Sequence, residues 1–379
     1  MKDSFDRRTV LLSLLAGAGT AAVAACQHAG KPLAQPTPSA TPTTPPTPSA
    51  TPVDTRPRWP LTGRLVKDPA ELKHAAVAVK VPDNKNEHPQ VGLDKADIVF
   101  VELDGYRDSS GYSSTRLVPV FHSRMPDDVA PVRSVRPVDV PLFSPIGVII
   151  GNTGATGWVG LYAKHYGRFL ESTLSYMATR GTGSYSIDPN RVRTYQGVTY
   201  YDRAVVCHPK VLAKQTRKFR GGPARSYFPW ALTDAEVSTA KGKAARAIHV
   251  PWKSGHSYDM GYAYDAKSGR YLRSMPWGKH VLANGTQVST DNVLVIRAGQ
   301  RYTKIFRGRG GPEPVHDIVN GKGTFYYFNG GKYVTGTWTK GAVNAPFTFT
   351  VSDGTPLKMA PGQTYVELPN TKAAVRISA

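Results

Sequence analysis

A proline-rich tract divides this chain into a short leader and a long body. Residues 31–60 consist mostly of Pro, Thr, Ser and Ala, and Pro-Thr-Pro-Ser-Ala-Thr-Pro occurs twice, from Pro36 and from Pro46. Such a composition cannot bury apolar surface, and where it is polyproline-like it extends by roughly 3 Å per residue. We therefore expect a semi-rigid spacer over residues 26–59. Its hydroxyls offer sites for O-linked sugars, although an unmodified linker is the simpler expectation.

The leader has the order of a secretory signal. Three basic residues among the first eight precede an uncharged, apolar stretch at residues 9–25, which closes with Val23-Ala24-Ala25-Cys26. The closing residues resemble the bacterial lipobox, which implies lipid attachment to the Cys26 thiol. The stretch is shorter than the roughly 20 apolar residues that span a bilayer. We expect residues 1–25 to be a signal peptide for general or twin-arginine export, and the body to be anchored on the extracytoplasmic face of the cell membrane.

The body is strongly basic. The chain carries a net charge of +21, and its first 59 residues contain six Lys or Arg and three Asp, which leaves +18 on residues 60–379. In a cytoplasmic chain this surplus would suggest nucleic acid, but an exported chain meets lipid head groups, wall polymers and polyprenyl phosphates instead. We expect the membrane, through Cys26, and an anionic wall polymer, polyprenyl phosphate or glycan as partners, and no nucleic acid.

The hydrophobic pattern changes near the middle of the body. Strand-like and helix-like segments alternate in residues 60–220, which predicts an α/β N-terminal domain. From residue 246 the pattern has period two with Gly-containing turns, which predicts a predominantly β C-terminal domain at 246–379 and a mixed α+β chain overall. Residues 221–245 are expected to connect the two domains. The strands expected in the first domain are 75–81, 97–102, 117–122 and 146–150, and the hairpins expected in the second are 261–273 and 325–335.

The most distinctive motif is Pro131-Val132-Arg133-Ser134-Val135-Arg136-Pro137. Ala96-Asp97-Ile98-Val99 precedes it, Asp202-Arg203 follows it, and Gly336-Thr337-Trp338-Thr339-Lys340 lies in the second half. Through these motifs nearly the whole body resembles the YerB-like lipoproteins, a family with paired N- and C-terminal domains of unknown function. The resemblance implies the two-part layout and a cell-envelope setting, and it brings no established activity.

The same motif supplies the candidate site. Guanidinium groups bind phosphate or carboxylate bidentately, and three arginines close together require an anion. We predict an anion-binding cleft, and internal pairing with Glu102 or Asp139 is the simpler reading of its arginines. The alternative function is an envelope enzyme that acts on a phosphate-linked or glycan substrate. In such an enzyme, Glu102 and His208 should face the arginines across a solvent-filled cavity. No residue is assigned a catalytic role. The residues predicted to line the cleft are Arg116, Arg133, Arg136, Ser134, Glu102 and His208.

A glycine-rich turn offers a further alternative. Gly154, Gly157 and Gly160 follow a predicted strand and precede a predicted helix, which is similar to the phosphate-binding turn of short-chain dehydrogenases. No clear strand ending in an acidic residue follows about 20 residues later, so a turn without a ligand is favoured over a dinucleotide-binding oxidoreductase. The scattered histidines and the two cysteines show no metal-ligand spacing. We expect neither a cofactor nor a metal.

Overall fold

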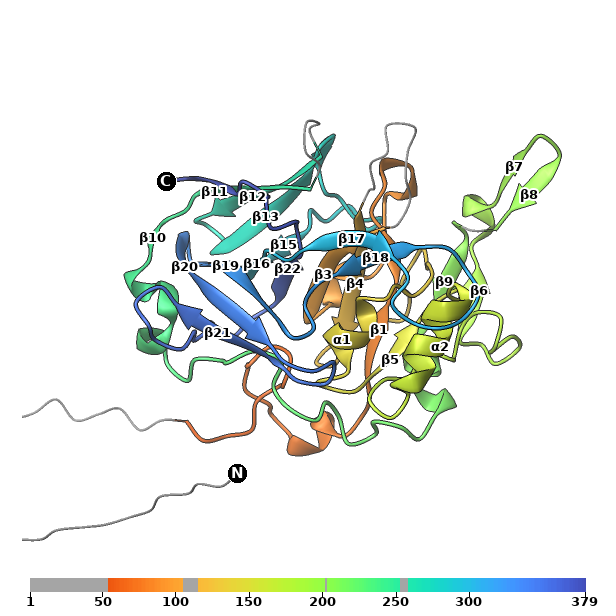
Figure 1. Ribbon diagram of the computed structural model, residues 1–379, viewed down its shortest axis with the longest axis horizontal. Coiled ribbons are helices and arrows are strands. Elements are labelled where there is room, and N and C mark those ends of the chain that lie inside the picture. Colours follow the sequence, from red (N-terminus) through yellow and green to blue (C-terminus); the bar gives the residue numbers. More distant parts are fainter. Residues whose placement is uncertain (1–53, 105–114, 202, 253–257) are drawn as a thin grey trace, which may run out of the picture. The chain divides into compact units, whose positions relative to one another are not determined.

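The computed structural model describes residues 54–104, 115–201, 203–252 and 258–379 (Figure 1). Among these residues, eleven strands form one large mixed sheet: β1 (Ala76–Val79), β2 (Val81–Pro82), β3 (Ile98–Leu103), β4 (Thr115–Phe121), β5 (Val148–Gly151), β10 (Lys243–Ala244), β16 (Asn292–Ile296), β19 (Gly321–Asn329), β20 (Lys332–Lys340), β21 (Phe347–Val351) and β22 (Thr364–Glu367). The sheet runs across Figure 1 in the order β10-β20-β19-β16-β22-β3-β4-β1-β5, with β2 paired to β4 and β21 to β20.

Strand β22 joins the two halves of the chain within this sheet. It pairs in parallel with β16 on one side and with β3 on the other, so that Val366 lies opposite both Leu294 and Phe100. All residues of β22 and β3 are buried, and the glutamate in each strand has a buried partner: Glu367 accepts from Trp252 and Tyr262, and Glu102 pairs with Lys80. The expected domain boundaries stay a prediction, but both expected domains contribute strands to one sheet.

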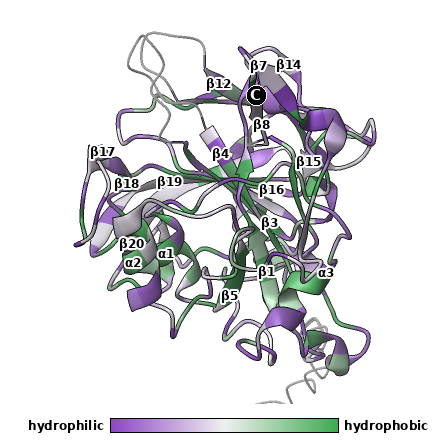
Figure 2. Ribbon diagram, turned by 90° about the vertical axis from the view of Figure 1, so that its right-hand side faces the viewer, coloured by the Kyte–Doolittle hydropathy of each residue, from purple (hydrophilic) through white to green (hydrophobic). Residues whose placement is uncertain are grey.

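Aromatic side chains cover β3. The ring of Phe100 packs at 5.5 Å from Phe143 of helix α1 (Asp139–Phe143) and at 5.4 Å from Tyr227, measured between ring centroids. The Tyr227 hydroxyl also donates to the carbonyl oxygen of Leu142 over 3.0 Å. Figure 2 shows the hydrophobic colouring concentrated on the central strands β1, β3 and β5. Tyr227 lies in the expected connector, so this segment packs into the core as part of it.

The second half also forms a sheet of its own among the described residues. Its strands are β11 (Ala247–Pro251), β12 (Asp259–Asp265), β13 (Arg270–Met275), β14 (Gly278–Lys279), β15 (Ser289–Thr290) and β23 (Arg376–Ser378). Hairpins β12–β13 and β19–β20 lie where the sequence predicted them. In the second, Gly330 and Gly331 have φ of 60° and 73°, as a two-residue type I′ turn requires. The prediction of a mixed chain with a β-rich second half is confirmed.

Shorter elements flank the sheets. In Figure 1, α1 and α2 lie beside β1 and β5. No helix in the described part of the chain is long and apolar enough to cross a membrane. The remaining helices and strands are α2 (Gly157–His165), α3 (Pro209–Leu212), β6 (Tyr185–Ile187) with β9 (Val205–Cys207), β7 (Arg193–Tyr195) with β8 (Val198–Tyr200), and β17 (Gln300–Thr303) with β18 (Glu313–His316). Single 3-10 turns cover Pro69–Leu72, Lys85–Glu87, Leu93–Lys95, Pro189–Arg191, Ala213–Gln215, Asp234–Glu236 and Ser238–Lys241.

Candidate anion-binding site

Four arginines line one cavity, which we call the arginine pocket. Its volume is about 550 Å³. It is lined by Asn84, Asn86, Glu87, Asp104, Arg116, Arg133, Ser134, Arg136, Arg203, Pro312 and Glu313. The structure therefore brings together Arg116, Arg133, Ser134 and Arg136, as the sequence suggested. Arg203, Glu87, Asp104 and Glu313 were not predicted to lie there.

Backbone hydrogen bonds fix the arginine motif between two strand ends. The Arg133 amide donates to the Lys80 carbonyl oxygen just after β1 over 2.8 Å, and the Arg133 carbonyl accepts from Thr153 after β5 over 3.0 Å. The Val135 amide then donates to the carbonyl of Gly154 over 2.8 Å. Because β1 and β5 are parallel neighbours, their carboxyl ends meet at one edge of the sheet, and the motif is held across that edge.

Arg116 is the most deeply placed of the four. It comes from β4, its side chain is 5% exposed, and it donates to the Ser134 carbonyl oxygen over 2.6 Å and to the Asp104 carboxylate. Its Nε is buried without a hydrogen-bond partner. Burial lowers the pKa of Arg116 to about 10, and the neighbouring charge of Arg136 acts in the same direction. The guanidinium stays charged at neutral pH, and it belongs to the floor of the pocket.

The other three arginines lie closer to solvent and share the remaining carboxylates. Arg133 donates to Glu87 over 2.5 Å, and Arg203 lies 2.9 Å from the same oxygen of Glu87. Arg136 donates to the backbone of Asp104 over 2.6 Å and lies 3.6 Å from Glu313. Among the residues that the structure describes, the lining holds four guanidinium groups and three carboxylates, which gives these groups one net positive charge.

Glu102 does not line the pocket, although it lies directly opposite Arg116 in the β3–β4 pair. It is fully buried and forms an ion pair with Lys80, whose ammonium also lies 2.7 Å from Asp139. Burial raises the pKa of Glu102 to about 8, and the charge of Asp139 contributes, because one ammonium cannot neutralise two buried carboxylates. Glu102 and Asp139 therefore pair with a buried lysine, and the pocket arginines pair instead with Glu87, Asp104 and Glu313.

His208 also lies away from the pocket lining. It precedes α3, with Nδ1 2.7 Å from Asp128 and Nε2 2.9 Å from the Ser186 hydroxyl. The arrangement expected of an enzyme, with Glu102 and His208 facing the arginines across the cavity, is not the one observed. Cys26, the predicted signal peptide and nearly all of the predicted linker lie outside the described residues.

Comparison with known proteins follows the two halves of the chain. Residues 61–206 match the model of the N-terminal domain of a protein family of unknown function, DUF3048, and residues 248–366 match its C-terminal domain. The chain belongs to this family. A relative of this chain in Bacillus subtilis (strain 168), "Putative lipoprotein YerB", is 26% identical over 327 residues, which cover 83% of this chain and 87% of the relative.

A solved structure shares the fold of this chain. The crystal structure of the YerB protein from Bacillus subtilis matches with a TM-score of 0.65 at 20% identity, and the match covers 85% of this chain and all of that one. The resemblance to YerB-like proteins drawn from the arginine motif is therefore confirmed. At this identity the structural match establishes the fold of this chain alone.

The glycine-rich turn of this DUF3048 member is closed by a distant loop. The amide of Trp158, in the first turn of α2, donates to the carbonyl oxygen of Arg309 over 2.8 Å, and the Trp158 indole donates to that of Gly311 over 2.9 Å. A Cβ on Gly157 would lie 2.8 Å from the same Arg309 oxygen. The close approach of the Arg309 loop explains why position 157 has no side chain. The carbonyl oxygens of Arg309 and Gly311 occupy the place at the start of the helix where a pyrophosphate would have to bind. This arrangement does not favour dinucleotide binding at the turn.

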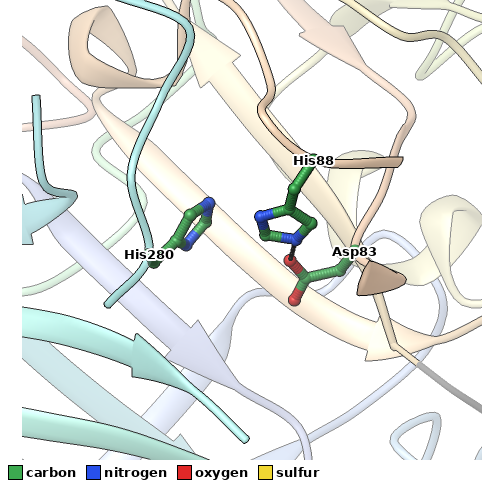
Figure 3. Close-up of side chains that lie close together, drawn as sticks. All are labelled: Asp83, His88 and His280. Carbon is green, nitrogen blue, oxygen red and sulfur yellow. Dashed lines mark hydrogen bonds and ion pairs between the residues drawn. The ribbon is translucent and has the colours of Figure 1, made fainter. Parts of the chain in front are cut away.

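A second polar cluster joins the two halves of this family member. Figure 3 shows Asp83, His88 and His280, whose ligand-type atoms lie within 4.8 Å of one another. Both ring nitrogens of His280 already have partners, Arg273 at 2.6 Å and Gln90 at 2.9 Å. A metal ion at His280 would have to displace Arg273 or Gln90 from its ring nitrogen, and it would be repelled by the positive charge of Arg273 nearby. The arrangement favours a buried hydrogen-bonded joint over a metal centre.

Proposed function

We propose that this chain is a lipid-anchored protein of the cell envelope that binds an anionic, phosphate-bearing wall or lipid-linked component in the arginine pocket. The anchor rests on Val23-Ala24-Ala25-Cys26, on the proline-rich spacer after it, and on the lipoprotein named among its relatives. The body then works on the extracytoplasmic face, where phosphate-bearing polymers and lipids are the abundant anions.

The observation that carries the proposal is the charge balance of the pocket. Four guanidinium groups face three carboxylates, and Glu87 is shared by Arg133 and Arg203. The buried Nε of Arg116 has no hydrogen-bond partner among the described residues. A phosphate group supplies several acceptor oxygens and a negative charge, both of which suit a lining rich in guanidinium groups. The body charge of +18 adds a long-range field that attracts polyanions.

The same geometry gives less support to an enzyme. The alternative requires an acid or base beside the bound anion, and the two residues assigned to that place lie elsewhere. Glu102 is held by Lys80 in the core, and His208 is held by Asp128 and Ser186. We therefore propose binding as the function of the pocket.

Titration calorimetry of the full-length, lipidated chain in detergent tests this proposal, with a glycerol phosphate polymer and a polyprenyl phosphate as ligands. Arg133→Ala should weaken binding about tenfold or more, since it removes a charge-assisted, bidentate contact. The matched control is Arg225→Ala, which removes the same charge from an exposed position outside the pocket. Equal affinities of the two variants would contradict the proposal.

A further inference from the structure

A hairpin without a third strand projects from the body. Strands β7 and β8 pair only with each other in the described residues, and they extend outward at the upper right of Figure 1. Gln196 and Gly197 form the turn, with φ of 47° and 76°, which fits the type I′ geometry of a two-residue hairpin. All six strand residues are exposed. An isolated hairpin of this kind is marginal in water, so a surface that contacts it would stabilise it.

The two faces of the hairpin differ in chemistry. Tyr195 pairs with Val198 and Arg193 with Tyr200, so these four side chains share one face, which we call the tyrosine face. The opposite face carries only the pair Thr194 and Thr199. On the tyrosine face, Tyr195 is 65% exposed, Val198 52% and Tyr200 41%. An apolar and aromatic face of this kind, presented at a projecting tip, is a contact surface without a partner in the described chain.

Both ends of the hairpin are fastened beside the arginine pocket. Before β7, Arg191 donates to the carbonyl oxygens of Glu87, over 3.3 Å, and of Pro89. After β8, Arg203 donates to the carbonyl of Asn86 over 3.3 Å. Glu87, Asn86 and Arg203 all line the pocket. The base of the hairpin therefore lies beside the pocket, and a surface bound by the hairpin would lie on the same side of the body.

Charge and residue type indicate what the tyrosine face contacts. Arg193 is the charged residue of the tyrosine face, whereas Arg191 before the hairpin pairs with Asp188 at 3.4 Å. Tyr side chains prefer the head-group level of a bilayer, where the ring is buried and the hydroxyl stays hydrated, and arginines are attracted to anionic lipids. Tyr and Arg are also enriched at protein interfaces. The tether favours the lipid surface, because it keeps the hairpin within reach of the membrane.

The tether makes even a weak surface contact effective. Residues 31–60 can extend by roughly 3 Å each, so the body of a chain anchored at Cys26 stays within reach of its own membrane. Tethering raises the effective concentration of the surface to the millimolar range, at which a few side chains suffice for docking.

We infer that the β7–β8 hairpin docks through its tyrosine face onto the anionic lipid surface to which the chain is tethered. Docking places the mouth of the arginine pocket at the level of the lipid head groups. It goes beyond anion binding in the pocket, because the hairpin face and the pocket use different side chains.

The test places a polarity-sensitive fluorophore at the hairpin turn through Gln196→Cys, in full-length lipidated chain reconstituted into vesicles. Cys207 is buried and so does not compete for the label. A control label at Ala240→Cys lies shortly before β10, which is on the other side of the body in Figure 1. In vesicles that contain phosphatidylglycerol, head-group-attached quenchers should quench the label at position 196 and leave that at 240 bright.

Two double variants of the labelled chain complete the test. Tyr195→Ser with Tyr200→Ser should reduce quenching at position 196 to the level of the control label, whereas Thr194→Ser with Thr199→Ser on the opposite face should not. Calorimetry with a glycerol phosphate polymer should be unchanged in both, which separates this inference from the pocket. Equal quenching of the labels at 196 and 240 overturns the inference. Protection of the label at 196 from quenching that rises with the number of chains per vesicle, and does not depend on lipid charge, also overturns it, because that result indicates contact between copies of the chain.

Discussion

Arg273 donates to Asp83 over 2.8 Å, and both side chains are completely buried. Asp83 follows β2 in the first half of the chain, and Arg273 belongs to β13 in the second sheet. Thr115 and His88 contact the same carboxylate at 3.0 and 3.2 Å. This ion pair therefore connects the second sheet to the segment that leads into the arginine pocket.

Breaking this pair should destabilise the whole body. Asp83→Asn leaves the Arg273 charge buried without its counter-charge, which should lower the free energy of unfolding by about 3–5 kcal/mol. Urea denaturation measures the change. The matched control is Asp317→Asn, since Asp317 pairs with Arg301 at 2.8 Å but is 43% exposed, and it should cost less than about 1 kcal/mol. Similar losses in the two variants would contradict the role given to Asp83.

Glu102 should make stability depend on pH. Burial and Asp139 raise its pKa to about 8, above the value of about 4.3 in an unfolded chain, so the folded state binds the proton more tightly. This contribution is present in full below about pH 4.3 and is lost as the pH rises towards 8. Glu102→Gln removes it, so the variant should gain stability relative to the parent protein between pH 5 and pH 8. Denaturation at both pH values measures the difference, and a difference that does not change with pH would show that Glu102 is not protonated in the folded core.

Glu87 should limit the affinity of the arginine pocket for anions. It holds both Arg133 and Arg203, so Glu87→Gln raises the net charge of the lining by one and releases two guanidinium groups. Binding of a glycerol phosphate polymer should strengthen by roughly threefold to tenfold. Glu71→Gln, at an exposed position outside the pocket, makes the same charge change and should leave affinity nearly unaltered. Weaker binding by Glu87→Gln would mean that this carboxylate orders the site for its ligand.

Gly157 should tolerate no side chain, in contrast to Gly160 in the same helix. A Cβ on Gly157 meets the Arg309 carbonyl oxygen at 2.8 Å, whereas one on Gly160 meets nothing closer than 3.9 Å. Gly157→Ala should cost roughly 1–3 kcal/mol, and Gly160→Ala should stabilise the helix by about 0.5–1 kcal/mol. Thermal unfolding compares the two. Equal stability would mean that the loop does not close the start of α2.

The sequence predicted the arginine motif well and its partners poorly. Arg116, Arg133 and Arg136 could be grouped because strand ends that carry such residues meet at a sheet edge. Glu87, Asp104 and Glu313 come from turns and from a distant strand, where neither periodicity nor spacing indicates proximity. Lys80 is the signal in the sequence for this buried pairing, since a lysine between Val79 and Val81 in an apolar segment needs a buried counter-charge. Glu102 and Asp139 both contact this lysine, which explains why Glu102 is not in the pocket.

The two-part layout was likewise predictable only to a point. Period-two alternation identified the hairpins of the second half correctly, because such patterns depend on neighbouring residues alone. The insertion of β22 between β3 and β16 depends on pairing between segments far apart in the chain, and the local pattern of each strand does not indicate its neighbours.

The most direct measurement of the central claim is a crystal structure of the chain with a glycerol phosphate oligomer bound. We expect phosphate density in the arginine pocket, within hydrogen-bond distance of the guanidinium groups of Arg133 and Arg136. Density for the oligomer at another surface, with the Arg133–Glu87 pair unchanged, would contradict the account.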